Sequence, residues 1–318
     1  MSIIEKAVEK LEKSGTATDE QQLKNAISRA AEETAEGITA PPPPPPPVPG
    51  AGDGQGGGEP QRNFVELPLA ALAKKGMITP DRPRSRIAEE YRIIKRPLLM
   101  NITGQGAAMV DNINLIMVTS ALQGEGKTFS AINLAMSMAM EQDKTVLFVD
   151  ADVAKASAAT LLGISSKRLG LIDLLEDPRI SVPDVLLHTN VPNLRILPAG
   201  RVHERATELL ASEAMHNLML ELSSRYPNRV IVFDSPPLLQ STEAVVLGNL
   251  MGQVVFIVAA GETRQELVNE AVHLLKGEKI IGMVLNKSRY RTTAKYGYGY
   301  GYGYGYGHRR VEPEPAVV

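Results

Sequence analysis

A short run of glycine, lysine and hydroxyl-bearing residues has the composition of a phosphate-binding loop. Residues 120–128 read SALQGEGKT, after an apolar run that ends at Thr119 and before an apolar helical pattern. Glycines let backbone N–H groups point at phosphate, and the N-terminus of the following helix adds a favourable dipole. We expect Lys127 to reach the β- and γ-phosphates of ATP and the Thr128 hydroxyl to bind Mg²⁺. The alternative is a chance glycine turn, because Ala121 stands where the full motif begins with glycine.

Two further segments place carboxylates directly after apolar runs. VLFV is followed by Asp150-Ala151-Asp152, and VIVF is followed by Asp234. The carboxyl ends of parallel strands meet at the edge where α/β sheets bind ligands. A single Asp after a strand is more often a turn or cap residue, but three beside a phosphate loop favour a catalytic role. They could hold Mg²⁺, for which we name Thr128, Asp152 and Asp234, or accept a proton from a hydroxyl.

The candidate site therefore has two groups of residues. The expected catalytic residues are Lys127, Asp150, Asp152 and Asp234. The expected nucleotide contacts of the loop and the first turn of its helix are Gln123, Gly124, Glu125, Gly126, Lys127, Thr128 and Phe129.

Short apolar runs alternate with helical patterns over most of the chain and would position these residues. The helical patterns include residues 85–99, Thr207–Arg225 and Arg264–Lys276. Apart from the run before the loop, the predicted strands are Val146–Val149, Leu194–Leu197, Val230–Phe233, Val254–Val258 and Ile280–Leu285. Continuous apolar strands separated by helices predict a doubly wound, mostly parallel α/β sheet with helices on both faces.

Composition narrows the class of protein. The chain has 318 residues, 43% of them hydrophobic, a net charge of -2 and no cysteine. A near-neutral charge argues against nucleic acid as a partner, and the absence of cysteine excludes disulfides and thiolate metal sites. The apolar stretch from Ala244 to Ala260 is interrupted by polar residues and is shorter than a membrane-spanning helix. We therefore expect a cytoplasmic protein.

Both ends of the chain differ in character from its centre. Residues 1–36 carry two capping signals and an apolar stripe at helical spacing, which predicts a helical docking region. Residues 37–62 contain seven consecutive prolines and a glycine-rich stretch, which predicts a linker. Residues 63–288 form the predicted nucleotide-binding domain, and residues 289–318 form a basic and Gly-Tyr-rich tail.

The tail contains a regular tyrosine cluster. Glycine alternates with Tyr296, Tyr298, Tyr300, Tyr302, Tyr304 and Tyr306. Glycine at every second position makes a stable strand unfavourable, so low-complexity sequence without a fold is one interpretation. Beside a phosphoryl-transfer site, a disordered tail that offers many phenols also has the character of a substrate.

These motifs resemble the bacterial tyrosine kinase family, a Min/Par-related branch of the P-loop NTPases. More narrowly, they resemble the tyrosine autokinases that accompany exopolysaccharide synthesis. The resemblance covers about residues 84–310, through GEGKT, VLFVDAD and VIVFDSPP. It implies an ATP- and Mg²⁺-dependent kinase that phosphorylates the tyrosine cluster and regulates exopolysaccharide polymerisation or export. It also implies a homo-oligomeric ring, a transmembrane co-polymerase as activator, a cognate tyrosine phosphatase, and recruitment to the inner face of the membrane.

The resemblance assigns roles to two further sets of residues. Glu89, Arg92 and Lys95 resemble the element that joins subunits into a ring, although an exposed charged helix face is the alternative. Asn286, in GMVLNK, resembles the strand end that contacts adenine. The chain departs from the family at Lys95, which replaces an arginine, and after Asp152, where Lys155 is the nearest basic residue.

Two competing functions remain open at this stage. A Min- or Par-like membrane-cycling ATPase without tyrosine kinase activity would share the phosphate loop, but Leu122 replaces the signature lysine of that group. A non-catalytic scaffold would use the proline segment and the tail to bind partners, and would bind no nucleotide.

Overall fold

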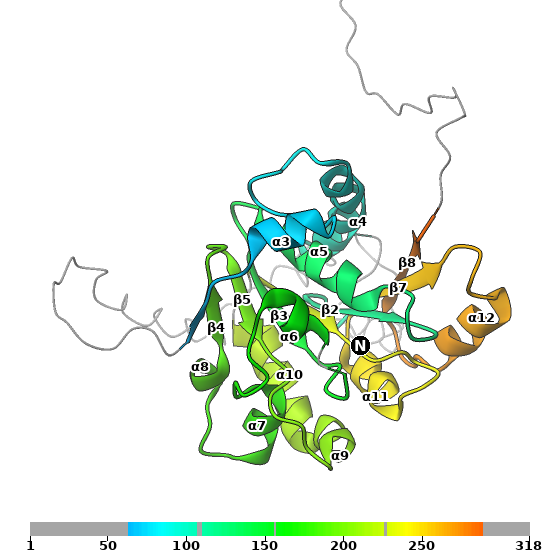
Figure 1. Ribbon diagram of the computed structural model, residues 1–318. Coiled ribbons are helices and arrows are strands. Elements are labelled where there is room, and N and C mark those ends of the chain that lie inside the picture. The colour runs from blue at the N-terminus through cyan, green and yellow to red at the C-terminus, as the bar shows by residue number, and fades with distance from the viewer. Residues whose placement is uncertain (1–62, 107–109, 156, 226–227, 289–318) are drawn as a thin grey trace, which may run out of the picture. The chain divides into compact units, whose positions relative to one another are not determined.

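A computed structural model describes residues 63–106, 110–155, 157–225 and 228–288 (Figure 1). The chain divides into two units, residues 1–58 and 59–318, and all described residues belong to the second. The predicted docking region, the whole of the linker and the tyrosine tail lie outside the described residues.

One eight-stranded sheet forms the centre of this unit. Its strand order is β1-β4-β5-β3-β6-β2-β7-β8, and every neighbouring pair is parallel except β4 and β5. The strands are β1 Phe64–Val65, β2 Leu115–Ser120, β3 Thr145–Asp150, β4 Leu187–Thr189, β5 Leu194–Leu197, β6 Arg229–Asp234, β7 Gln253–Ala259 and β8 Ile280–Asn286. The predicted mostly parallel sheet is confirmed. Only the two- and three-residue strands β1 and β4 were too short to show a pattern.

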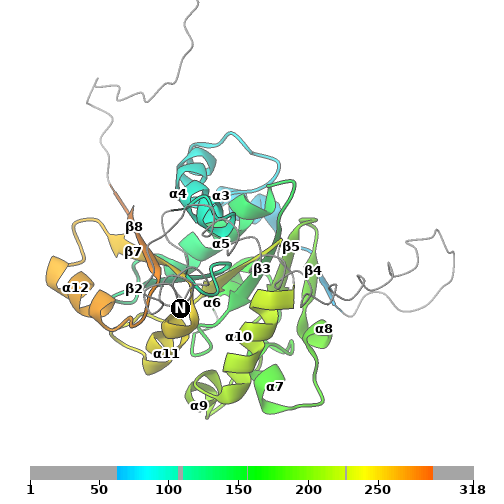
Figure 2. The same cartoon turned by 180° about the vertical axis from the view of Figure 1, so that it is seen from behind.

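Helices cover both faces of the sheet (Figures 1 and 2). They are α3 Leu69–Lys74, α4 Arg86–Ile102, α5 Lys127–Ala139, α6 Ser157–Leu162, α7 Leu171–Glu176, α8 Val182–Val185, α9 Ala206–Leu210, α10 Glu213–Arg225, α11 Thr242–Leu250 and α12 Gln265–His273. Helices α3, α4, α5 and α6 share one apolar core, whereas α7, α9, α10, α11 and α12 share the core on the opposite face. Alternate side chains of the central strands enter the two cores.

The register of the central strands brings the predicted acidic residues to one edge. Asp150 of β3 lies directly beside Asp234 of β6, and Asp234 also pairs in register with Val118 of β2. The loop between β2 and α5 leaves the sheet at the same edge, because all three strands run in the same direction. Parallel topology therefore brings together segments more than 100 residues apart in sequence.

One predicted helix is wrong in its extent. The pattern Thr207–Arg225 predicted a single helix, but the structure has α9 and α10 with a break at Ala211 and Ser212. The Ser212 hydroxyl accepts a hydrogen bond from the Met215 backbone N–H at 3.3 Å and so caps the second helix. The break ends α9 at Leu210, a residue that lines the cavity of the candidate site.

The apolar stretch from Ala244 onward also divides, into α11 and β7. Gly252 lies at this division, with backbone oxygens of Asp111 and Asn112 so close that a Cβ would meet them at 2.5 Å. Only glycine permits this approach, and the helix ends just before it, where Met251 already has the extended backbone angles φ -89° and ψ 140°.

Helix α4 presents the predicted oligomer element in two different environments. Ser85 caps the helix, and Glu89 and Arg92 form an exposed ion pair with each other. Lys95 instead is only 6% exposed, and its ammonium contacts the Glu141 carboxylate at 2.7 Å and the Ser137 carbonyl at 2.5 Å. The three residues therefore do not form one exposed charged face, because Lys95 serves the packing of α4 on α5.

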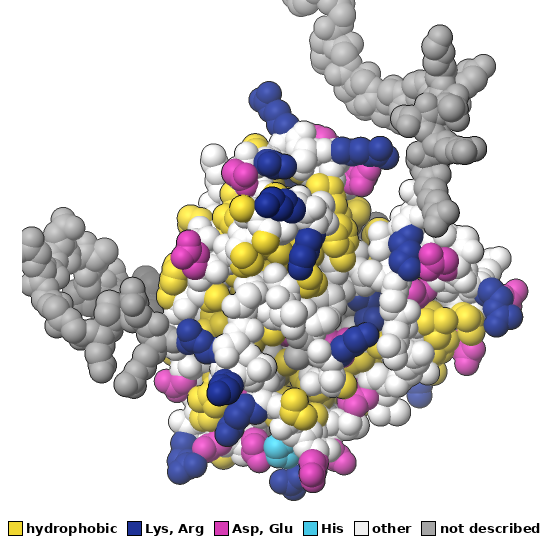
Figure 3. Space-filling view, in the orientation of Figure 1, with side chains coloured by type: hydrophobic (Ala, Val, Ile, Leu, Met, Phe, Trp, Pro, Cys, Tyr) yellow, Lys and Arg dark blue, Asp and Glu magenta, His cyan; other side chains and the backbone are white. Residues whose placement is uncertain are grey.

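The surface gives no single-sign field on the face shown in Figure 3, where positive and negative side chains are interspersed. Among the described residues, no helix combines the length and apolar character needed to cross a bilayer.

Candidate active site

The loop between β2 and α5 has the backbone conformation of an anion cradle. Gly124 and Gly126 have φ angles of 79° and 100°, which residues with a side chain rarely adopt. Gly126 is the N-cap of α5, and no side chain caps this helix end. The first N–H groups of α5 therefore point out of the loop toward any bound anion, with the helix dipole behind them.

Glu125 holds this loop from within. Its side chain is 4% exposed, and one carboxylate oxygen accepts a hydrogen bond from the Leu122 backbone N–H at 2.6 Å. The other oxygen accepts a hydrogen bond from the Thr263 hydroxyl, in the loop after β7. Glu125 does not line the cavity beside the loop, and its side chain instead links two parts of the backbone around it. Its expected contact with the nucleotide stays a prediction.

Asn286, at the end of β8, supports the same loop from another side. Its amide donates a hydrogen bond to the Glu125 carbonyl at 2.8 Å, and a Cβ on residue 126 would lie 2.1 Å from that amide nitrogen. Gly126 is therefore required both for its φ angle and for this close approach. Asn286 does not line the cavity described next, and its expected contact with adenine stays a prediction.

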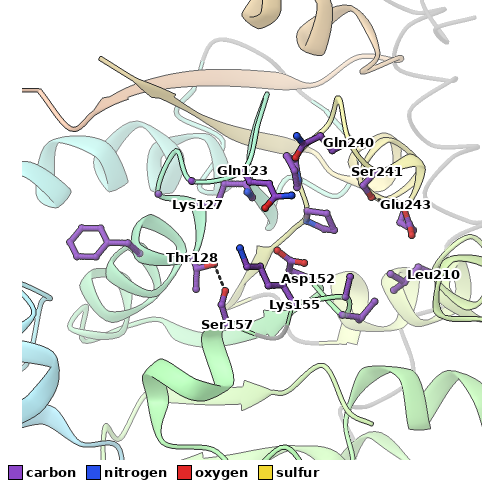
Figure 4. A pocket seen from close by; sticks show the side chains of 17 residues that line it. Gln123, Lys127, Thr128, Asp152, Lys155, Ser157, Leu210, Gln240, Ser241 and Glu243 are labelled. Carbon is purple, nitrogen blue, oxygen red and sulfur yellow. Dashed lines mark hydrogen bonds between the residues drawn. The ribbon is translucent and has the colours of Figure 1, made fainter. Parts of the chain in front are cut away.

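A cavity of about 490 Å³ opens beside the loop (Figure 4). Its phosphate-loop side is formed by Gln123, Gly124, Gly126, Lys127, Thr128 and Phe129. Its other walls are formed by Asp152, Val153, Ala154, Lys155, Ser157, Leu210, Pro236, Pro237, Gln240, Ser241 and Glu243. The Thr128 hydroxyl lies 3.0 Å from the Ser157 hydroxyl, which links α5 to α6.

Two buried carboxylates lie near this cavity, without lining it, and lack hydrogen-bond partners within the described part of the chain. Asp150 and Asp234 are 1% and 0% exposed, and none of their carboxylate oxygens has a hydrogen-bond partner among the described residues. Burial, followed by the charge of Asp152, raises the pKa of Asp150 to about 7. Burial and the charge of Asp150 raise the pKa of Asp234 well above its usual range, and nearby Thr128 and Lys127 offset only part of this. Unpartnered buried carboxylates are costly unless a ligand or cation completes them.

Asp152 and Lys127, which both line the cavity, attract each other electrostatically. Burial raises the pKa of Asp152, while Lys127 and Lys155 oppose this effect. Burial lowers the pKa of Lys127, and the charges of Asp152, Asp234 and Glu125 counteract it. The arrangement therefore combines a cation for phosphate with carboxylates for a metal ion or a proton.

The residues present fit Mg²⁺. Among the described residues, no group of three or more His, Cys, Asp or Glu side chains could hold a metal ion alone. Mg²⁺ is commonly bound by one or two carboxylates, with phosphate oxygens and water as the other ligands. Thr128, Asp152 and Asp234 could provide the protein's share, since the Asp234 oxygens have no other partner among the described residues.

The structure thus brings the predicted loop and acidic residues to one edge of the sheet. It also shows one wall of the cavity that the sequence did not indicate. Ser157, Leu210, Gln240, Ser241 and Glu243 also line the cavity. Ser241 and Glu243 carry the sequence signature of a helix N-terminus, but nothing in the pattern directs that helix toward the site. Leu210 has no signal at all, because its place depends on the break between α9 and α10.

Replacement of Glu125 should test its role in holding the loop. Glu125→Ala leaves the half-buried Leu122 N–H without its acceptor, so we expect a loss of about 1 kcal/mol in unfolding free energy and weaker ATP binding. Glu125→Gln retains one acceptor and should lose less of both. Thermal unfolding and ATP titration measure the two effects, and equal stability of the alanine variant and the wild type would contradict this role.

The raised pKa of Asp150 predicts a pH-dependent cost of folding. Between its ordinary value near 4 and its folded value of about 7, the unfolded chain releases this proton while the folded chain retains it. The stability associated with this group is therefore full below pH 4 and is lost as pH rises to about 7. Asp150→Asn should raise the midpoint of thermal unfolding by several degrees at pH 8 and much less at pH 5, without nucleotide or Mg²⁺. The exposed Asp143→Asn is the matched control, and an equal effect at both pH values would refute this explanation.

Comparison with known proteins places the chain in a family. A family described as an AAA domain matches residues 113–264. The tyrosine-protein kinase YwqD of Bacillus subtilis is 30% identical over 226 residues, covering 70% of this chain and 91% of YwqD. The succinoglycan biosynthesis transport protein ExoP of Rhizobium meliloti is 31% identical over 224 residues, covering 69% of this chain and 27% of ExoP.

A solved structure gives the same result for the fold. The kinase domain of the Escherichia coli tyrosine kinase ETK superposes with a TM-score of 0.59 at 25% identity, covering 76% of this chain and 94% of that domain. The sequence similarity extends over nearly the whole of YwqD. The chain therefore belongs to the bacterial tyrosine kinases of the capsule and exopolysaccharide type and is a protein-tyrosine kinase.

Proposed function

We propose that this kinase uses ATP and Mg²⁺ to phosphorylate the tyrosine cluster of its own C-terminal tail, in trans, and thereby regulates exopolysaccharide synthesis. The observation that carries the proposal is the cavity in which Lys127, Thr128 and Asp152 meet, next to the unpartnered carboxylates of Asp150 and Asp234. This set of groups matches phosphoryl transfer, where positioning and charge neutralisation supply most of the rate enhancement.

The chain's own residues can be assigned to parts of this reaction. The loop and the N-terminus of α5 hold the phosphates, and Lys127 balances charge on the transferring group. Mg²⁺, when bound, neutralises charge on the β- and γ-phosphates. A bond forms between the tyrosine oxygen and the γ-phosphorus as the bond to the β-phosphate oxygen breaks, and ADP leaves with that electron pair. Asp152 lines the cavity and accepts the phenolic proton.

The substrate assignment rests on the tail sequence. Six tyrosines alternate with glycine between residues 296 and 306, outside the described residues. Strand β8 ends at Asn286, at the same sheet edge as the cavity, because the strands on that side are parallel. A tail that starts near one active site and reaches the site of a neighbouring copy suits trans-phosphorylation within an assembly.

The remaining parts of the proposal concern partners. We propose that residues 1–36, which lie outside the described residues, dock on a transmembrane co-polymerase protein at the cytoplasmic face of the membrane and that a tyrosine phosphatase reverses the reaction. Glu89 and Arg92 on the exposed side of α4 support a subunit contact there. The buried Lys95 would support that contact by fixing α4 against α5.

Lys127→Met should abolish transfer of labelled γ-phosphate to tyrosine, with a loss of at least about 100-fold, because no charge then balances the transferring group. The fold should persist, and Lys276→Met, at an exposed lysine outside the cavity, is the matched control. Full phosphotyrosine labelling of the Lys127→Met chain on its own would refute the site assignment. Release of the label as free phosphate by the unmodified chain, without phosphotyrosine, would instead favour a cycling ATPase.

Phosphorylation of the tail should dissociate the assembly. Each phosphotyrosine adds about -1.5 to -2 charges, so six exceed the positive charge of Arg291, Lys295, Arg309 and Arg310. Repulsion from Asp152 and bound nucleotide would then expel the tail from a neighbour's site, in proportion to the number of groups added. Replacing all six tyrosines by Phe should remove most labelling and retain the assembled state. Light scattering after size-exclusion chromatography measures the mass, and identical masses with and without phosphate would defeat this proposal.

A further inference from the structure

The cavity has a side that the nucleotide phosphates do not use. The loop and Lys127 hold the phosphates at one side, and an acceptor must approach the γ-phosphorus opposite the leaving oxygen. Figure 4 shows Leu210 and Glu243 on the side of the cavity away from Thr128, with Asp152 between. The acceptor tyrosine must therefore enter past the wall formed by α9 and the start of α11.

This wall contains an apolar part and one fixed anion. Leu210, Pro236 and Pro237 line this part of the cavity, and all three are buried, so the apolar area that they offer a phenol ring is small. Glu243 lies beside them in the first turn of α11. Its carboxylate accepts hydrogen bonds from the Thr207 hydroxyl of α9 and from the Ser241 hydroxyl, both at 2.5 Å.

The two hydroxyl groups hold Glu243 in place without neutralising it. Burial alone would raise the pKa of Glu243, but the hydrogen bonds from Ser241 and Thr207 outweigh it and lower the pKa, so the carboxylate is ionised at neutral pH. Among the described residues, no ion pair is formed by this carboxylate at salt-bridge distance. The charge of Glu243 is therefore not balanced by an ion pair within the described part of the chain. A fixed negative charge of this kind beside an acceptor site attracts positively charged substrate segments.

We propose that Glu243 is a specificity-determining residue of the acceptor site and recognises a lysine or arginine next to the tyrosine to be phosphorylated. The chain's own tail offers this pattern at Lys295-Tyr296, where the first tyrosine of the cluster follows a lysine. The same charge disfavours acidic neighbours, including a phosphotyrosine two residues away. This inference rests on the proposed function, since it takes the tail as the acceptor.

The test separates the enzyme from the acceptor, with both as full-length chains. The enzyme carries Phe at Tyr290 and at the six cluster tyrosines, so that its own tail cannot be labelled. The acceptor carries Lys127→Met and keeps Tyr296 as the only tyrosine of residues 289–318. Acceptors with Lys295, Lys295→Gln and Lys295→Glu are compared at saturating ATP and Mg²⁺, and initial rates against acceptor concentration give kcat and KM.

We expect the enzyme with Glu243 to show a KM about three- to tenfold lower for the Lys295 acceptor than for the Lys295→Gln acceptor, with kcat less affected. Glu243→Gln should reduce this preference to less than about twofold, and Glu243→Lys should make the Lys295→Glu acceptor the better substrate. Glu208→Gln removes an exposed charge from α9 that does not line the cavity, and it should keep the original preference.

Two outcomes would overturn the inference. One is a KM preference that is the same for the enzyme with Glu243 and for its Glu243→Gln and Glu243→Lys variants. The other is the absence of any preference among the three acceptors with the unmodified site. The second needs no change at Glu243, so it holds even where a variant at that position fails to fold. Absence of label both on Tyr296 in every combination and on a Lys127→Met acceptor that keeps all six cluster tyrosines would instead refute the tail as substrate, which distinguishes failure of the proposed function from failure of this inference.

Discussion

The structure depends on keeping the backbone amides of one loop available for phosphate. A loop whose N–H groups point outward cannot stabilise itself with its own main-chain hydrogen bonds, so side chains must hold it. Glu125 binds the Leu122 amide and the Thr263 hydroxyl, and Asn286 binds the Glu125 carbonyl. These contacts connect the loop to β7 and β8. The two outer strands on that side of the sheet therefore support the phosphate loop, although neither Glu125 nor Asn286 lines the cavity.

The same edge of the sheet concentrates charge where water is largely excluded. Parallel pairing places Asp150 and Asp234 side by side at the ends of β3 and β6, both fully buried and both without partners among the described residues. In the absence of ligands this arrangement costs folding free energy, since burial favours the protonated forms. A cation bound beside them would recover part of that cost. Stability and ligand binding would then be linked through the same two carboxylates.

Charge also varies across the cavity in a way that suits transfer between two substrates. Lys127 and Lys155 provide positive charge near the phosphates, whereas Glu243 provides negative charge on the wall opposite Thr128. Under the two proposals above, the first pair would attract the nucleotide and Glu243 would favour an acceptor segment that carries a cation. Each substrate would then be attracted to its own part of one cavity. Helix α9 contributes at both of its ends, because Thr207 near its start binds Glu243 and Leu210 at its last position lines the cavity.

Much of the fold and part of the site were determined by local sequence. Continuous apolar runs predicted the six longer strands, since buried parallel strands require apolar side chains on both faces. The GEGKT loop and the acidic strand ends predicted a phosphate and metal site, because those residue types at those positions have few other uses. Tertiary structure alone decided the rest. Lys95 became buried against Glu141 because α4 packs on α5, and Glu243 reached the cavity because β6 and α11 return to the same sheet edge. Such contacts join residues far apart in sequence, and no local periodicity records which of them will meet.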